Sequence, residues 1–184
     1  MTTLLQKGRL QARQSDAPRD IAKALALRAL AFGCEDGDEL DSICSHVLIE
    51  DVETGALLAC FRMLALNGKD LAKSYSAQYY ELTALERFDG PMVEMGRFCT
   101  HPDHNADPDL LRVAWGAMTA YVDANKVEFL FGCSSFAGTD TAAYLDSFAM
   151  LKELHLAPKR WLPRVKAPKV FRYAAQLRRK PDLK

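Results

Sequence analysis

Two opposite charges, Glu94 and Arg97, lie three residues apart inside the apolar run 92–98. A carboxylate can take a proton from a reacting ammonium group, and a guanidinium can bind a carboxylate or a phosphate through its planar fork. On a regular strand, residues three apart point to opposite faces. Either these charges point apart, or a β-bulge near Gly96 re-aims one of them, and bulges are frequent beside active sites. This segment is therefore the first candidate for chemistry.

The same run leads into a turn and a second candidate feature. After the turn at 101–104 come Asp107 and Pro108, which predict a helix with an aspartate cap and a proline in its first position. The N-terminus of a helix is a favourable place for a phosphate. We expect the acidic side chains Asp107 and Asp109 to point outward, because they would repel such a phosphate.

Two other kinds of site are disfavoured by the spacing. Cys99, His101 and His104 could ligate a metal, but a second pair of ligands is missing, so no metal site is expected. A hydrolase with a cysteine or serine nucleophile among residues 133–135 is also disfavoured, since no G-x-S-x-G turn is present.

The composition describes one globular domain. The chain has 184 residues, of which 49% are hydrophobic, enough for a sizeable single core. It shows neither an apolar run long enough to span a membrane nor a signal-peptide pattern, so we expect a cytoplasmic protein. The cysteines are odd in number and scattered in apolar runs, which indicates reduced, buried thiols; they are Cys34, Cys44, Cys60, Cys99 and Cys133.

Charge is distributed unevenly along a chain whose net charge is zero. Residues 152–184 contain 11 Lys and Arg against 2 Asp and Glu. This basic end, from about residue 155, is either a solvated surface or a surface for an acidic protein or an anionic membrane. No motif for nucleic-acid binding accompanies it, so we do not expect a nucleic-acid partner.

The order of expected elements indicates a mixed α/β domain. Strands are expected at 8–14 (an edge strand), 45–51, 56–66, 92–98, 127–133 (buried on both faces) and 169–174; helices at 16–32 (capped by Asp16), 108–123 and 138–154; and a helix or cover loop at 70–86. On the first helix, Arg28 lies among apolar residues and either snorkels to solvent or has a functional partner.

Several motifs together resemble a known family. They are Arg28-x-x-x-Phe32, Asp38-x-x-Asp41, the strand 61–64 with Arg62, the run from Glu94 to Pro102 with Arg97, and the run Gly132-Cys-Ser-Ser-Phe136. The set is similar to the acyl-homoserine-lactone synthases and, more closely, to the ornithine-acyl-ACP N-acyltransferases that make lyso-ornithine lipid.

The resemblance implies a single GNAT-like acyltransferase domain over residues 1–184, with a mixed central sheet flanked by helices. It implies no bound cofactor: the donor acyl group would be carried on the phosphopantetheine of acyl carrier protein, and the acceptor would be an amino acid. Ornithine is favoured as acceptor, with glutamine or another amino acid left open. The alternatives are an enzyme like the acyl-homoserine-lactone synthases and a non-catalytic domain that binds acyl carrier or lipid. An anionic membrane is a second partner, which would place the protein at the periphery of the inner membrane.

The resemblance also assigns roles to residues. Glu94 is either the general base or a structural half of a buried ion pair, and Arg97 accompanies it as a catalytic residue. Substrate-binding residues are Arg28, Phe32, Asp38, Asp41, Arg62 and Ser134. Asp38 and Asp41 either bind the acceptor amine or lock the N-terminal segment through the two arginines. Side chains that either line an acyl pocket or belong to the core are Phe61, Met63, Met95, Trp115, Leu130 and Phe136.

Overall fold

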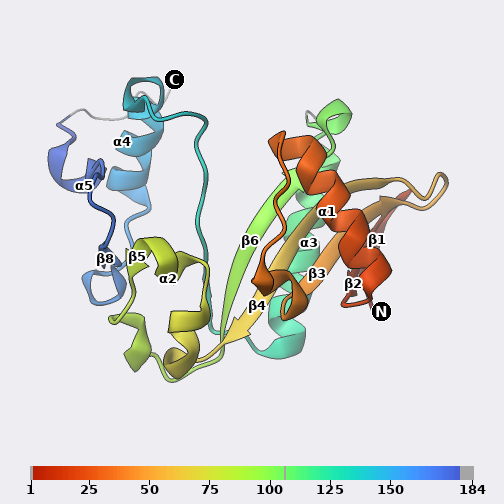
Figure 1. Cartoon of the computed structure of the whole chain (residues 1–184), viewed down its shortest axis with the longest axis horizontal. Coiled ribbons are helices and arrows are strands. Elements are labelled where there is room, and N and C mark those ends of the chain that lie inside the picture. The colour runs from red at the N-terminus through yellow and green to blue at the C-terminus, as the bar shows by residue number, and fades with distance from the viewer. Residues whose placement is uncertain (1, 106, 179–184) are drawn as a thin grey trace.

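The computed structural model describes residues 2–105 and 107–178, and its centre is a six-stranded mixed sheet (Figure 1). The strands lie in the order β1 (Thr2–Lys7), β2 (Leu10–Ser15), β3 (Ser45–Asp51), β4 (Leu57–Leu66), β6 (Met92–Thr100) and β7 (Phe129–Phe131). All neighbours are antiparallel except β6 and β7, which are parallel. The mixed α/β fold expected from the sequence is confirmed.

Two long helices cover the sheet on opposite faces. Helix α3 (Pro108–Asn125) packs on the main core formed with β2, β3 and β4, and α1 (Pro18–Phe32) packs on the other face (Figure 1). Helix α3 begins as predicted, because the Asp107 carboxylate accepts from the Asp109 N–H at 2.9 Å and Pro108 occupies the first turn. The predicted Asp16 cap of α1 is wrong: Ala17 holds the cap position, and Ser15 Oγ accepts the Ala17 N–H.

The remaining elements gather beside the β6–β7 end of the sheet, away from α1 (Figure 1). They are α2 (Ser76–Tyr79), β5 (Tyr80–Glu81), α4 (Leu145–Leu154), β8 (Arg164–Val165) and α5 (Tyr173–Gln176). Strands β5 and β8 form a separate two-stranded sheet. The described part of the chain contains no helix long and apolar enough to cross a membrane.

Three strand predictions need correction. The predicted edge strand at 8–14 is β2, an inner strand, and the edge is taken by β1. The strand expected at 127–133 shortens to β7, which is partly exposed because it forms the other edge of the sheet. The strand expected at 169–174 is wrong: residues 169–172 form neither helix nor strand, and α5 begins at Tyr173, which stacks on Phe148 of α4 with centroids 5.5 Å apart.

A β-bulge interrupts β6, as one of the two sequence alternatives required. The pairing of β4 with β6 shifts register between Cys60 opposite Cys99 and Arg62 opposite Gly96, so β6 carries one extra residue. Arg97 adopts a left-handed conformation there, with φ of 56°. Phe98 packs against the α3 side of the core, whereas Arg97 turns to the α1 side. The bulge therefore re-aims Arg97 to the face of β6 that carries Glu94.

Strands β6 and β7 separate just beyond Glu94. Their pairing ends with Glu94 opposite Phe131, although β6 continues to Thr100. The next residue, Gly132, lies against the Met95 carbonyl so closely that any Cβ would collide with that backbone oxygen. A glycine at this position lets the two backbones touch at the point of separation.

This contact predicts that Gly132→Ala lowers the free energy of unfolding by about 1–3 kcal/mol, because the clash is with backbone. Urea unfolding measures it. Gly37→Ala is the matched control, since its Cβ would meet only Leu25 Cδ2 at 3.6 Å. Equal stability of the two variants would show that the strands can separate without cost.

Candidate active site

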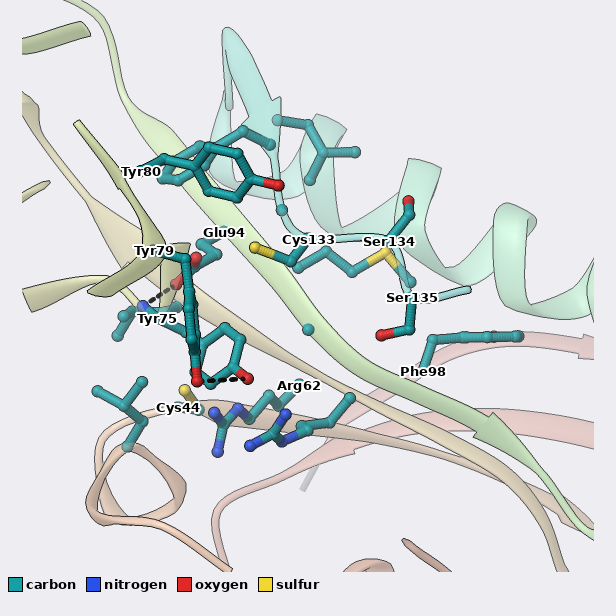
Figure 2. A pocket seen from close by; sticks show the side chains of 18 of the residues that line it. Cys44, Arg62, Tyr75, Tyr79, Tyr80, Glu94, Phe98, Cys133, Ser134 and Ser135 are labelled. Atoms are coloured by element: carbon teal, nitrogen blue, oxygen red, sulfur yellow. Dashed lines mark hydrogen bonds between the residues drawn. The ribbon is translucent and has the colours of Figure 1, made fainter. Parts of the chain in front are cut away.

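A cavity of about 960 Å³ opens where β6 and β7 separate. Figure 2 shows side chains from β6, from the segment that follows β7 and from the α2 segment converging on it. The residues that line it come from five parts of the chain. They are Phe32 and Leu40; Tyr75, Tyr79 and Tyr80; Arg62 of β4 with residues 94–98 of β6; Trp115 with residues 130–135; and Ala167 and Val170 of the C-terminal segment. The cavity thus has a charged end and a largely apolar remainder.

Glu94 lies at the charged end, 4% exposed. Its Oε1 accepts the Ser76 N–H at 2.6 Å and its Oε2 accepts the Tyr75 N–H at 2.8 Å. Among the described residues it forms no ion pair with Arg97, so the structural role expected from the sequence takes another form, an anchor for the start of α2. Each carboxylate oxygen has a second lone pair that these bonds leave available.

A buried ion network lies beside this carboxylate and joins α1 to β4. Arg28, 1% exposed, donates to Asp41 Oδ1 at 2.6 Å and to Asp36 Oδ2 at 2.8 Å. Arg62 donates to the same Asp41 oxygen at 2.6 Å and to Asp38 at 2.5 Å. Arg28 therefore does not snorkel. The contacts of Asp38 and Asp41 are those of the locking role, and binding of an acceptor amine by them stays a prediction.

Arg97 extends the network to the cavity. Its Nη2 donates to Asp38 at 3.2 Å, and its Nε lies 3.1 Å from Asp36 Oδ2. The guanidinium also stacks over the Tyr75 ring, 4.5 Å from the centroid. This arrangement holds a cation at the cavity wall on the same side as Glu94.

The network fixes the ionisation of its members. Burial opposes the ionisation of Asp41, but hydrogen bonds from Arg28, the Asp38 N–H and Arg62 outweigh it and lower the Asp41 pKa to about 2. Burial also opposes ionisation of Asp38, and Arg62 again lowers that pKa below its ordinary value. The carboxylates are therefore charged at neutral pH, and the loop 33–44 is tied to the sheet by charge-assisted hydrogen bonds.

The other predicted site residues divide into two groups. Phe32 and Ser134 line the cavity, and so do Met95, Trp115 and Leu130 among the expected pocket residues. Three of the expected pocket residues do not line it. Phe61 and Met63 are 1% exposed members of the main core, and Phe136 packs against Tyr144 and Phe148.

Helix α3 explains why Trp115 reaches the cavity. The buried stripe of α3 runs through Leu110, Val113, Ala114, Ala117, Met118 and Tyr121. Leu111 and Trp115 lie outside that stripe and are 44% and 62% exposed. Trp115 therefore stands at the rim of the cavity and not in the core.

Four residues of the site were missed by sequence reasoning: Tyr75 and Cys133 line the cavity, and Asp36 and Ser76 contact residues that line it. Asp36 lay in the acidic stretch but outside the Asp38-x-x-Asp41 motif, and Tyr75, Ser76 and Cys133 carry no motif of their own. Ser76 Oγ and Cys133 Sγ are 3.3 Å apart, and Ser76 also donates to Glu94. The one available signal for Cys133 was its place inside the Gly132–Phe136 run.

The turn after β6 has a structural role in the contacts observed. His101 Nδ1 accepts the Asp103 N–H, and no metal-binding cluster of His, Cys, Asp or Glu occurs within residues 2–105 and 107–178. Asp109 points outward, as expected, to Lys7 at 3.3 Å and Arg112 at 3.0 Å.

The cysteines mostly follow expectation. All five are free, and Cys44, Cys60 and Cys99 are buried, whereas Cys34 is exposed, contrary to the expected burial. Its exposure follows from its place just after Gly33, which ends α1 in a left-handed conformation.

Of the basic C-terminal end, residues 179, 180 and 184 lie outside the part of the chain that the structure describes.

Known proteins are similar to this chain in sequence and in fold. The family model for the acetyltransferase (GNAT) domain matches residues 27–115. An L-ornithine N(alpha)-acyltransferase of Rhodobacter capsulatus is 34% identical over 137 residues, 71% of this chain and 52% of that protein. The one from Brucella abortus is 27% identical over 134 residues, 68% of this chain and 47% of that protein. The chain spans about half the length of these curated relatives.

A solved structure with a similar fold is an N-acyl amino acid synthase from uncultured soil microbes. It has a TM-score of 0.50 and 15% identity, and the match covers 67% of this chain and 70% of that one. At this identity the likeness shows the fold alone, which is the GNAT fold expected from the sequence.

Proposed function

Because the chain belongs to the GNAT-type family of the L-ornithine N(alpha)-acyltransferases, we propose that it transfers a long acyl chain from a thioester donor to the α-amine of an amino acid, with ornithine as the first candidate. The observation that carries the proposal is the position of Glu94, a buried carboxylate with free lone pairs at the charged end of a cavity whose remainder is apolar.

The proposed reaction uses the two ends of the cavity differently. Glu94 takes a proton from the acceptor ammonium, directly or through water, and the neutral amine attacks the thioester carbonyl. Backbone N–H groups around the bulge at 95–98 stabilise the oxyanion that forms. The carbon–sulfur bond then breaks, giving the amide and a free thiol, while the apolar part of the cavity holds the acyl chain.

We propose acyl carrier protein as the source of the donor, giving a lyso-aminolipid product. The support is the basic C-terminal segment, which borders the cavity: Ala167 and Val170 line it, and the neighbouring Lys169 and Arg172 are exposed. Carrier proteins of this kind are acidic, and opposite charge favours their encounter.

The test mixes the protein with the same acyl chain on carrier protein and on coenzyme A, with ornithine, glutamine or lysine as acceptor, and follows N-acyl amino acid by mass spectrometry. Product with ornithine supports the proposal. Absence of product with every pair would favour a non-catalytic binding domain.

The carrier itself is tested by reversing charge at Lys169 and Arg172. We expect Lys169→Glu with Arg172→Glu to raise KM for the carrier-bound donor about tenfold or more at low salt, and to leave KM for a free acyl-pantetheine donor unchanged. An equal change for both donors would mean that the segment does not recognise the carrier. Loss of binding to anionic vesicles without a change in KM would assign the segment to a membrane.

A further inference from the structure

Cys133 contacts the residue that holds Glu94. It follows β7 by two residues, just after the Gly132 contact with the Met95 carbonyl, and it lines the cavity. Its Sγ lies 3.3 Å from Ser76 Oγ, and the Ser76 N–H holds Glu94. Figure 2 shows the sulfur turned toward the Glu94 end of the cavity. A single residue, Ser76, therefore contacts both the thiol and the carboxylate that we propose as the base.

The tyrosine hydroxyl groups of the cavity are less suited than the Cys133 thiol to donate a proton there. The Tyr75 hydroxyl donates to the Tyr79 hydroxyl at 3.4 Å, and Tyr79 and Tyr80 are 48% and 46% exposed. Cys133 is half-buried, and burial raises the pKa of its thiol, so Cys133 keeps its proton at neutral pH. An alkylthiolate, with a conjugate-acid pKa near 8.5 in a cysteine-like thiol, leaves more readily when a proton reaches its sulfur.

From this geometry we infer that Cys133 is a catalytic residue, the general acid that protonates the departing thiol of the donor, with Ser76 holding it in position. The inference rests on the proposed acyl transfer. As the carbon–sulfur bond breaks, the Cys133 S–H proton passes to the leaving sulfur and Cys133 becomes a thiolate. The proton that the acceptor nitrogen releases on amide formation then returns to Cys133 through the Ser76 hydroxyl or water. Glu94 gives the proton that it took from the ammonium group to solvent, so both residues regain their starting states.

The test compares two donors with the same acyl chain, one an alkyl thioester of pantetheine and one an aryl thioester. An aryl thiolate is a weaker base and departs without a proton. Cys133→Ala is expected to lower turnover of the alkyl thioester by roughly 10²-fold, in line with a lost general acid, and to leave the aryl thioester nearly unaffected. Ser76→Ala keeps the backbone bond to Glu94 and is expected to show the same selectivity with a smaller loss.

Cys44→Ala is the matched control, because it removes a second thiol from the lining of the same cavity, beside Arg62. Its effect, whatever the size, is expected to be equal for the two donors. Equal losses for Cys133→Ala with both donors would overturn the inference and make Cys133 structural. Absence of transfer by the unaltered protein from either donor would instead refute the proposed function.

Discussion

Glu94→Gln is expected to reduce turnover by roughly 10²- to 10⁴-fold, the range typical of a lost general base. Glutamine has nearly the same shape but cannot take the ammonium proton. The measurement is steady-state formation of N-acyl amino acid at saturating donor. Near-normal turnover would make Glu94 structural only.

Glu94 also anchors the start of α2, so a structural loss must be separated from a chemical one. In the unaltered protein the Tyr75 and Ser76 N–H groups bind different oxygens of Glu94, whereas glutamine offers them a single oxygen. The expected cost is about 1–3 kcal/mol in the free energy of unfolding.

The pH dependence of the residual rate distinguishes a chemical loss from a structural one. In Glu94→Gln the residual rate should rise about tenfold per pH unit below the amine pKa, because only amine already neutral can react. A structural defect would lower the rate equally at every pH.

Asp41→Asn is expected to lower the free energy of unfolding by about 3 kcal/mol, because two buried arginines lose a shared counter-charge. Arg28 and Arg62 are 1% and 4% exposed, and both donate to the same Asp41 oxygen. Denaturant unfolding at neutral pH measures the loss. Asp109→Asn is the matched surface control, because its pairs to Lys7 and Arg112 are exposed to solvent and its loss is expected to be much smaller than that of Asp41→Asn.

The same residue predicts a pH dependence of stability. The Asp41 pKa is lowered from 3.8 to about 2 in the folded protein, so the carboxylate is favoured in its charged form by folding. This contribution, roughly 2 kcal/mol, is complete above the unfolded pKa and is lost as pH falls from about 4 toward 2. Unfolding measured between pH 6 and 2 should show a shallower acid slope in Asp41→Asn. An unchanged slope would mean that other carboxylates set the acid limit.

The elements around the site were predictable where local chemistry decides them. Asp107 and Pro108 fixed the start of α3, and Glu94 with Arg97 three apart in an apolar strand required either opposed faces or a bulge. The structure contains the bulge. For Asp38 and Asp41 the sequence left two roles open, binding of the acceptor amine or a tie to Arg28 and Arg62, and the structure shows the contacts of the tie.

Only part of the cavity wall was predictable, because the rest depends on contacts between distant parts of the chain. The short elements α2, β5 and β8 have too few residues for any periodic pattern. Cys133 reaches the cavity only because β7 stops pairing at Phe131. Helix α3 packs its buried stripe on the sheet, which leaves Trp115 at the rim of the cavity.

The pairing of β5 with β8 has a consequence for the order in which the site can form. Residues 75 and 76, which bind Glu94, precede it in the chain, but their segment is also held from the far side by β8 and by the Lys166 Nζ donating to the Ala77 carbonyl at 2.6 Å. During synthesis, the sheet and α1 can pack while that support is still absent. The segment that binds the carboxylate therefore gains its support from β8 and Lys166 only after residue 166 has been made. We expect a chain shortened before β8 to fold at its core but to hold Glu94 less firmly.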